Sequence, residues 1–233
     1  MRDMKRLLRK GVENIHPYIP GKPLEEVQAE LGLSQVIKMA SNENPLGPSP
    51  KAVAAMEREL KNIHRYPEGP CTVLRNHLSE RLGIRENMVT LSNGSDNCAL
   101  LVGNAFINEG DEILMAYPTF LVYETIARIM GGRPVSIKLR DHIHDLHNML
   151  GAINEKTKLV FVCNPHNPTG TIVGRRELDE FVKGLPEHAV LVLDEAYGDF
   201  VSAEDYPDGL DYVKQGRNVV VLRTFSKLYG LAG

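Results

Sequence analysis

Residues 218–230 read NVVVLRTFSKLYG. The apolar run Asn218–Leu222 predicts a buried β-strand, and the small and hydroxyl-bearing residues after it predict a turn around Lys227. A lysine amine that is desolvated in such a turn can hold an aldehyde as a Schiff base. The stretch therefore indicates an enzyme that uses Lys227 as a covalent catalyst.

The bulk composition is that of an ordinary globular chain. It has 233 residues, of which 42% are hydrophobic and 24% are charged, so disorder is not expected. The net charge of −3 gives no reason to expect nucleic acid or an anionic membrane as a partner. No apolar run approaches the length of a membrane span, and none follows the basic start as a secretory signal would. We therefore expect a cytoplasmic protein.

Cysteines and histidines give no sign of a metal or disulfide site. The cysteines, odd in number and widely spaced, are Cys71, Cys98 and Cys163. That spacing fits neither a disulfide framework nor zinc ligands, so we interpret them as thiols in a reducing cytosol. His142, His144 and His147 surround a loop, but no second ligand group accompanies them. We interpret this cluster as solvated surface and expect no metal.

The first part of the chain reads as an arm rather than a domain. Within residues 1–45 the sequence predicts a helix over Leu24–Leu31 and a strand-like segment over Val36–Met39. After an irregular loop, Ser49 caps the next helix, and Pro50 stands in its first turn, where its missing N–H does no harm.

From Cys71 onward, strands and helices alternate. The predicted strands are Met88–Leu91, Glu112–Ala116, Pro134–Leu139, Lys158–Cys163, Ala189–Leu193 and Asn218–Leu222. The predicted helices are Thr72–Leu82, Asn97–Ile107, Phe120–Met130, Leu146–Ile153 and Arg176–Val182. The strands are continuously apolar, as expected when both faces are covered. We therefore predict an α/β fold with three layers, in which helices cover both faces of a mostly parallel sheet.

The loops after these strands carry complementary chemistry, because open α/β sheets place ligands at the carboxyl ends of their strands. Ser95 and Asp96 open a helix whose N–H groups suit a phosphate, although either residue could instead be a simple N-cap. No lysine-bearing phosphate loop is present, which argues against a nucleoside triphosphatase. Phe120 follows the predicted strand Glu112–Ala116. Its ring could stack on a flat heterocycle or belong to the core.

Two later loops add polar groups. The prolines around Asn167 either form a rigid loop or hold its amide so that it donates to a phenolate oxygen. Asp194 ends a strand and could pair with a protonated pyridine nitrogen, bind a metal or act as a cap. Tyr197 could donate a hydrogen bond to a ring hydroxyl. With Lys227, these groups match the needs of pyridoxal 5'-phosphate.

The chain resembles the fold-type I aminotransferases of class I/II, which bind pyridoxal phosphate, and among them the histidinol-phosphate aminotransferases. The resemblance extends over essentially the whole chain. Its specific motifs are SNENPLGPSP at Ser41–Pro50, NPHNPTG at Asn164–Gly170, TFSKLYGLAG at Thr224–Gly233 and RYPE at Arg65–Glu68.

The resemblance implies a role for each matching residue around the cofactor ring. Lys227 would form the Schiff base with the cofactor aldehyde and then act as general acid and base. Asp194 would pair with the pyridine nitrogen, while Asn167 and Tyr197 would bind the ring oxygen. Phe120 would stack on the ring.

The resemblance also implies how phosphate and substrate are held. The phosphate would be lined by Ser95, Asp96, Thr224 and Ser226. Tyr66 would complete this site from the neighbouring subunit of a homodimer. Tyr18 and Asn44 match substrate-side positions. For Tyr18 and Tyr66 the alternative is a packed or exposed tyrosine in a proline-rich loop.

By the same resemblance, residues 1–45 form an N-terminal arm that contacts the small domain and the dimer partner. Residues 46–233 form a truncated cofactor-binding large domain, and the C-terminal small domain with its substrate arginines is absent. The family also has a later antiparallel strand between Met88–Leu91 and Asn218–Leu222. We therefore expect an open sheet edge and a chain that aggregates or depends on another chain.

The implied function is transamination of L-histidinol phosphate with 2-oxoglutarate, which gives imidazole acetol phosphate and L-glutamate in histidine biosynthesis. An aromatic or broad-specificity aminotransferase and a threonine-phosphate decarboxylase of the same branch are alternatives. A non-catalytic truncated fragment is a third. A nicotinamide dehydrogenase is disfavoured, because no G-x-G-x-x-G turn follows the first predicted strand.

Overall fold

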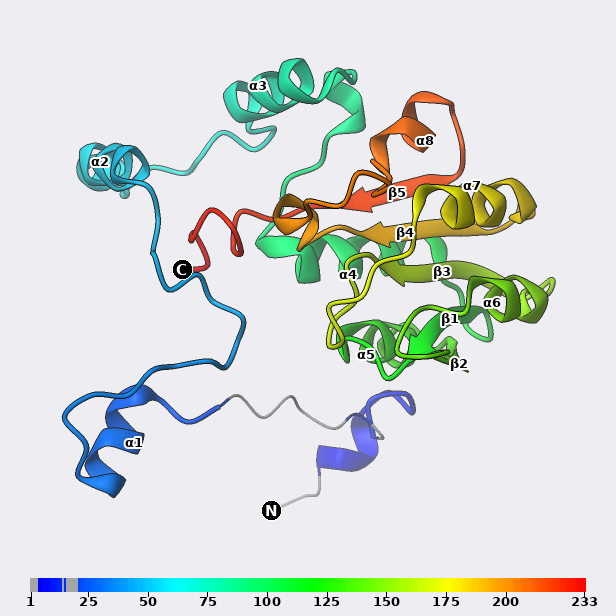
Figure 1. Ribbon diagram of the computed structural model, residues 1–233, viewed down its shortest axis with the longest axis horizontal. Helices are drawn as coiled ribbons and strands as arrows, with labels where there is room; N and C mark the ends of the chain where they lie inside the picture. Colours follow the sequence, from blue (N-terminus) through cyan, green and yellow to red (C-terminus); the bar gives the residue numbers. More distant parts are fainter. Residues whose placement is uncertain (1–3, 14, 16–20) are drawn as a thin grey trace. The chain divides into compact units, whose positions relative to one another are not determined.

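The structure is a computed structural model that describes residues 4–13, 15 and 21–233 (Figure 1). Its chain forms two compact units. The first consists of Met1–Ile15 and His64–Thr224, and the second of His16–Ile63 and Phe225–Gly233. Tyr18 lies outside the described residues. The predicted division at residues 45 and 46 stays a prediction.

The first unit is built on a parallel sheet, drawn as a fan of arrows in Figure 1. Among the described residues the sheet has five strands in the order β2-β1-β3-β4-β5. They are β1 (Glu112–Tyr117), β2 (Arg133–Lys138), β3 (Thr157–Cys163), β4 (Val190–Asp194) and β5 (Val219–Leu222). Every neighbouring pair is parallel. The predicted parallel sheet is confirmed, with strand ends that differ by about a residue.

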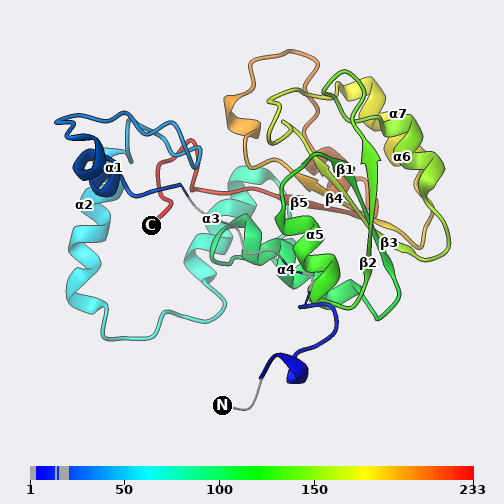
Figure 2. The same cartoon turned by 90° about the horizontal axis from the view of Figure 1, so that it is seen from below.

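Helices cover both faces of this sheet. The α-helices of the unit are α3 (Thr72–Leu82), α4 (Gly94–Phe106), α5 (Val122–Ile129), α6 (Leu146–Ala152), α7 (Arg175–Gly184) and α8 (Leu210–Lys214). Short 3-10 helices are η1 (Met4–Leu7), η3 (Glu86–Met88) and η4 (Gly198–Phe200). Figure 2 shows α4 and α5 on one side of the sheet, with α6 and α7 on the other. The predicted three-layer α/β fold is confirmed.

Side-chain alternation along β3 explains why the strands are apolar throughout. Leu159, Phe161 and Cys163 enter the core under α4 and α5. Val160 and Val162 enter the core under α6 and α7. Successive side chains of a strand point to opposite faces, so a sheet that is covered twice needs apolar residues at both.

Two predicted strands are wrong. Within Met88–Leu91, Met88 ends η3, and Val89 has extended dihedrals but joins no strand ladder in the described part of the chain. Val36–Met39 likewise forms no strand, and Ile37 and Met39 are 87% and 89% exposed. An apolar extended segment becomes a strand only where a partner satisfies its backbone groups, and neither segment has one here.

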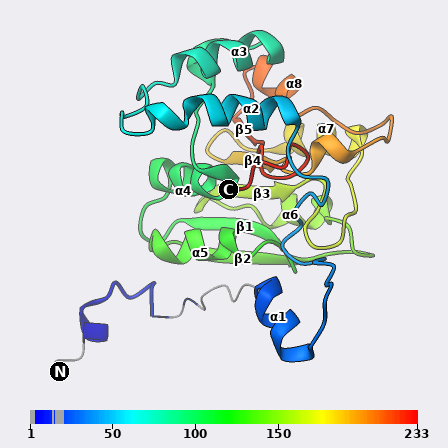
Figure 3. The same cartoon turned by 90° about the vertical axis from the view of Figure 1, so that its left-hand side faces the viewer.

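The second unit contains α1 (Leu24–Leu31), α2 (Pro50–Glu59) and η2 (Leu60–Asn62). The bounds of α1 match the prediction, and Gly32 ends it in the left-handed conformation with φ 63°. The predicted cap of α2 is confirmed, because Ser49 Oγ accepts a hydrogen bond from Ala52 N at 3.2 Å. Figure 3 shows α2 along its length.

Gly103 offers a matched test of the packing between α4 and α5. A Cβ at position 103 would stand 2.5 Å from Ile126 Cγ2, whereas a Cβ at Gly151 of α6 would meet no atom within 4 Å. We expect Gly103→Ala to lower the free energy of unfolding by about 1–3 kcal/mol through overpacking. Gly151→Ala should raise it by about 0.5–1 kcal/mol. Urea unfolding measures both, and equal effects would contradict this packing.

Candidate active site

Asp194 is the buried charge at the carboxyl edge of the sheet. It ends β4, where the register pairs it with Cys163 of β3 and Leu222 of β5, and it is 4% exposed. Tyr123 Oη donates to its Oδ2 at 2.7 Å, and Ala196 N donates to its Oδ1 at 3.0 Å. A buried carboxylate that is held in this way suits a protonated pyridine nitrogen, so the residues fit pyridoxal phosphate.

An aromatic cluster surrounds this carboxylate. Tyr123 of α5 stacks on Phe161 of β3, with centroids 4.4 Å apart and an interplanar angle of 18°. The rings of Phe120 and Tyr123 pack edge-on, with centroids 5.8 Å apart and an interplanar angle of 85°. Phe120 is half-buried and packs against the core, so the core interpretation holds. Stacking of Phe120 on a cofactor ring stays a prediction.

The NPHNPTG loop is held by hydrogen bonds on both sides of Asn167. Asn164 donates from Nδ2 to Val173 O at 3.2 Å and accepts from Val173 N at 3.0 Å. His166 Nε2 lies 2.9 Å from Pro118 O, and Gly170 N donates to His166 O at 2.7 Å. These bonds confine the loop that carries the half-buried Asn167. Tyr197 follows β4 and is also half-buried.

The interpretation of His144 as solvated surface is wrong. His144 is 6% exposed, and its ring meets that of His166 edge-on with centroids 4.4 Å apart. Its Nε2 lies 2.9 Å from Cys163 O, so it carries the proton and donates to this carbonyl. Burial lowers the pKa of His144 to about 3 and also lowers the pKa of His166. Both rings are therefore neutral and tie loops together, while His142 and His147 are exposed.

The residues of the first unit that are predicted to bind phosphate lie at the start of a helix and after the end of a strand. Ser95 and Asp96 lie in the first turn of α4, whose N-cap position is taken by Asn93. The N-cap alternative for Ser95 and Asp96 is therefore wrong, since the helix begins at Gly94, before the predicted Asn97. Thr224 follows β5 and is half-buried. Tyr66 is fully exposed, which fits the exposed-tyrosine alternative.

Sequence reasoning missed an ion pair next to Asp194. Glu195 is 4% exposed, and its Oε2 accepts from Arg223 Nη2 at 2.8 Å and Nε at 3.0 Å. Its Oε1 accepts from Gly209 N at 2.7 Å. Burial raises the pKa of Glu195, and the Arg223 charge opposes that rise. The pair fixes Arg223, which directly precedes Thr224. The sequence did carry a signal for this pair. Glu195 is an acidic residue just after one apolar strand, and Arg223 is a basic residue just after the next.

In the second unit, two motifs that are distant in sequence meet. Lys227 Nζ donates to Ser41 O at 3.3 Å, across a sequence separation of 186 residues. Asn44 Nδ2 donates to Leu228 O at 2.7 Å. Gly230, with φ +64°, lies so close to Gly47 that a Cβ would stand 2.6 Å from its carbonyl carbon. Ser226 and Lys227 are half-buried. These contacts show that the lysine segment, Phe225–Gly233, packs against the Ser41–Pro50 motif.

This three-layer fold, with a parallel sheet and a buried aspartate at its carboxyl edge, is that of the fold-type I pyridoxal-phosphate aminotransferases. The family model of class I and II aminotransferases matches residues 34–233. The chain belongs to the class I and II aminotransferase family, and its predicted membership is confirmed.

Within this family, the chain is similar to histidinol-phosphate aminotransferases. The chain is 53% identical over 226 residues to a histidinol-phosphate aminotransferase of Moorella thermoacetica. The alignment covers 97% of this chain and 58% of that protein. A crystal structure of histidinol-phosphate aminotransferase from Sinorhizobium meliloti with pyridoxal-5'-phosphate matches with a TM-score of 0.85 and 25% identity, over 97% of this chain and 60% of that chain.

A further solved structure belongs to another activity. The L-threonine-O-3-phosphate decarboxylase of Porphyromonas gingivalis has a TM-score of 0.67 and 25% identity, over 80% of this chain and 56% of that chain. In all these comparisons the chain spans less than two thirds of its relative. Among the described residues, no helix is long and apolar enough to cross a membrane. The same residues hold no group of three or more His, Cys, Asp or Glu suited to a metal ion.

We expect His144 to make stability fall on acidification. The unfolded chain takes up a proton near pH 6.5, while the folded imidazole does so only near pH 3, so stability is lost as pH falls between these values. From pH 7 to pH 5 the loss is about 2 kcal/mol. His144→Gln should flatten this slope, whereas exposed His147→Gln should not. Urea midpoints at both pH values measure it, and equal slopes would contradict the buried neutral state.

Proposed function

We propose that this chain binds pyridoxal 5'-phosphate through Lys227 and serves the transamination of L-histidinol phosphate. The observation that carries the proposal is the buried Asp194 carboxylate, held by Tyr123 and the Ala196 N–H at the carboxyl edge of the sheet. The identity of 53% to a histidinol-phosphate aminotransferase supports the substrate. The amino acceptor is 2-oxoglutarate.

The chain's own residues have distinct tasks in this reaction. Bound pyridoxal phosphate supplies an electron sink for the bond broken at the substrate carbon. Asp194 holds the proton on the ring nitrogen, which strengthens that sink. Asn167 and Tyr197 donate hydrogen bonds to the ring oxygen and fix its orientation. Lys227 would hold the cofactor through its aldehyde and would act as base and acid for the proton at the substrate carbon that bears the amino group.

The cofactor phosphate is bound by the first turn of α4 and by the hydroxyl residues that follow β5. Backbone N–H groups in the first turn of α4, at Ser95 and Asp96, favour an anion, because the helix dipole places partial positive charge there. The hydroxyls of Thr224 and Ser226 add donors. Tyr66 completes the site from the partner subunit of a homodimer, and its full exposure leaves it accessible for that role. Tyr18 and Asn44 contribute to substrate binding.

The remaining parts of the proposal concern the whole protein. Residues 1–45 form the arm and residues 46–233 the cofactor-binding domain. The protein works in the cytoplasm in histidine biosynthesis. The threonine-phosphate decarboxylase alternative has lower support, since that similarity has a TM-score of 0.67 against 0.85.

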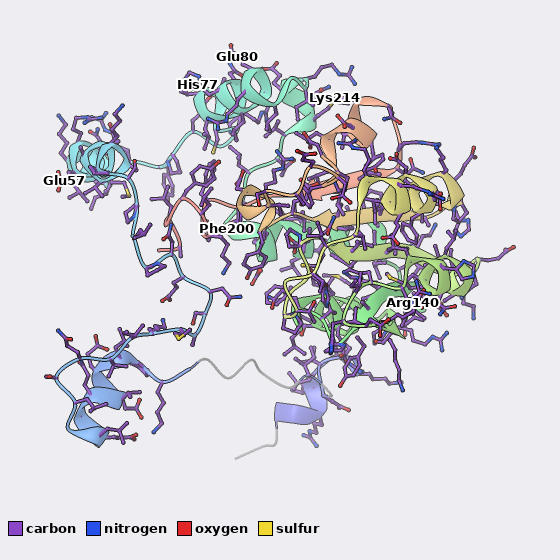
Figure 4. All side chains as sticks on the ribbon, in the orientation of Figure 1. Glu57, His77, Glu80, Arg140, Phe200 and Lys214 are labelled. Carbon is purple, nitrogen blue, oxygen red and sulfur yellow. The ribbon has the colours of Figure 1, made fainter. Side chains whose placement is uncertain are left out.

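We expect Lys227→Ala to abolish covalent cofactor binding, because the alanine has no amine. Protein is mixed with pyridoxal phosphate, reduced with borohydride and digested, and the adduct is located by peptide mass. Wild type should carry it on Lys227. The control is Lys214→Ala, which removes an exposed amine at the end of α8 (labelled in Figure 4) and should leave the adduct unchanged. Folded wild-type protein without an adduct on Lys227 would contradict the proposal and favour the non-catalytic fragment.

The substrate is tested by competing amino donors. With 2-oxoglutarate present, we expect glutamate to form faster from L-histidinol phosphate than from phenylalanine, by about 10-fold or more in kcat/KM. Loss of carbon dioxide from threonine phosphate is measured in parallel as a decarboxylase control. Lys227→Ala should lower the transamination rate by about 10²–10⁴-fold or more. A preference for phenylalanine or release of carbon dioxide would instead support the corresponding alternative.

A further inference from the structure

Tyr123 contacts two of the residues that the cofactor site needs. Its hydroxyl donates to Asp194 Oδ2 at 2.7 Å, and its ring packs edge-on with the ring of Phe120, with centroids 5.8 Å apart. The other side of the ring stacks on Phe161 in the core. Tyr123 is 1% exposed, so the hydroxyl and the ring are both held in one place by packing.

The hydrogen bond between Tyr123 and Asp194 has a fixed direction. Burial, and then the negative charge of Asp194, raise the pKa of Tyr123 well above its ordinary value. The phenol therefore keeps its proton and acts as the donor. A bond from a protonated donor to a carboxylate is charge-assisted and stabilises the ionised form of the carboxyl group.

The neighbouring thiol does not compete for this role. Cys163 pairs with Asp194 in the register of β3 and β4, and its Sγ donates to Pro165 O at 3.2 Å. Burial, followed by the charge of Asp194, raises the pKa of Cys163 to about 12, so the thiol stays neutral. The hydroxyl of Tyr123 supplies the 2.7 Å bond to Asp194 Oδ2.

We propose that Tyr123 is a positioning residue of the cofactor site, which keeps the Asp194 carboxylate ionised and oriented and sets its place relative to Phe120. This inference rests on the proposed binding of pyridoxal phosphate. An ionised Asp194 keeps the proton on the cofactor's ring nitrogen, and a fixed carboxylate plane directs that bond. Tyr123 acts through Asp194 and touches no reacting atom.

The chain provides a matched control for this role. Tyr212 of α8 is 3% exposed, and its hydroxyl donates to Asp179 Oδ1 at 2.7 Å. It therefore shares bond length and partner type with Tyr123, but its partner Asp179 is half-buried and it packs in the opposite core, under α6 and α7. A purely structural contribution of a buried tyrosine hydroxyl should appear equally in both Phe variants.

The experiment compares Tyr123→Phe with Tyr212→Phe as purified protein mixed with pyridoxal phosphate. The dissociation constant is measured by titration, and the protonation of the ring nitrogen by the ¹⁵N shift of labelled cofactor. We expect Tyr123→Phe to weaken cofactor binding by about 10- to 100-fold, as for a lost hydrogen bond to a charged group. Its ¹⁵N shift should move toward the deprotonated value. Tyr212→Phe should keep wild-type affinity within about twofold and the wild-type shift.

The outcomes separate this inference from the proposed function. If wild type binds the cofactor on Lys227 and the two Phe variants behave alike, Tyr123 has no positioning role. If wild type fails to bind, the proposed function falls, and this inference falls with it. If Tyr123→Phe does not fold, 3-fluorotyrosine at position 123 replaces it, since it keeps the ring but is a more acidic donor. An unchanged affinity and ¹⁵N shift with that residue would overturn the inference.

Discussion

The whole arrangement depends on burying both faces of a parallel sheet. Strands β1, β3 and β4 present apolar side chains to two cores at once, so polar groups cannot lie along them without cost. Polar chemistry is displaced to the ends of the strands, where loops begin. Parallel strands bring their carboxyl ends to one edge, and this is why the strand residue Asp194 and the loop residues Asn167 and Phe120 belong to the same edge of the sheet.

Burial also dictates how the charges at that edge are managed. Asp194 and Glu195 are consecutive and both about 4% exposed, yet their neighbours differ. Glu195 is neutralised by Arg223, whereas a phenol and a backbone N–H hold Asp194. An arginine would compete with a protonated ring nitrogen for the carboxylate, but a neutral phenol leaves its negative charge in place. The two adjacent carboxylates therefore differ in their described partners, which are a cation for Glu195 and neutral donors for Asp194.

Local signals in the sequence were sufficient where the structure is decided locally. The predicted helix Thr72–Leu82 is α3, which Gly83 ends in the left-handed conformation, and the residue type of Ser49 was enough to predict its cap. Met88–Leu91 has the same apolar character as the true strands, but pairing is a non-local property that no single segment encodes. His144 failed for a related reason, because its burial comes from the distant His166 and Cys163. Arg223 was overlooked because its partner lies on the neighbouring strand.

The seating of the lysine segment on the Ser41–Pro50 motif has a consequence for folding. The contact between Lys227 and Ser41 closes a loop of 186 residues, and ordering such a loop costs on the order of 5 kcal/mol of chain entropy. The few contacts of the lysine segment offset little of this entropy cost. The segment is therefore not expected to become ordered before the sheet has formed and reduced the effective length of the loop. We therefore expect Lys227 to become ordered late in folding, after the sheet has formed.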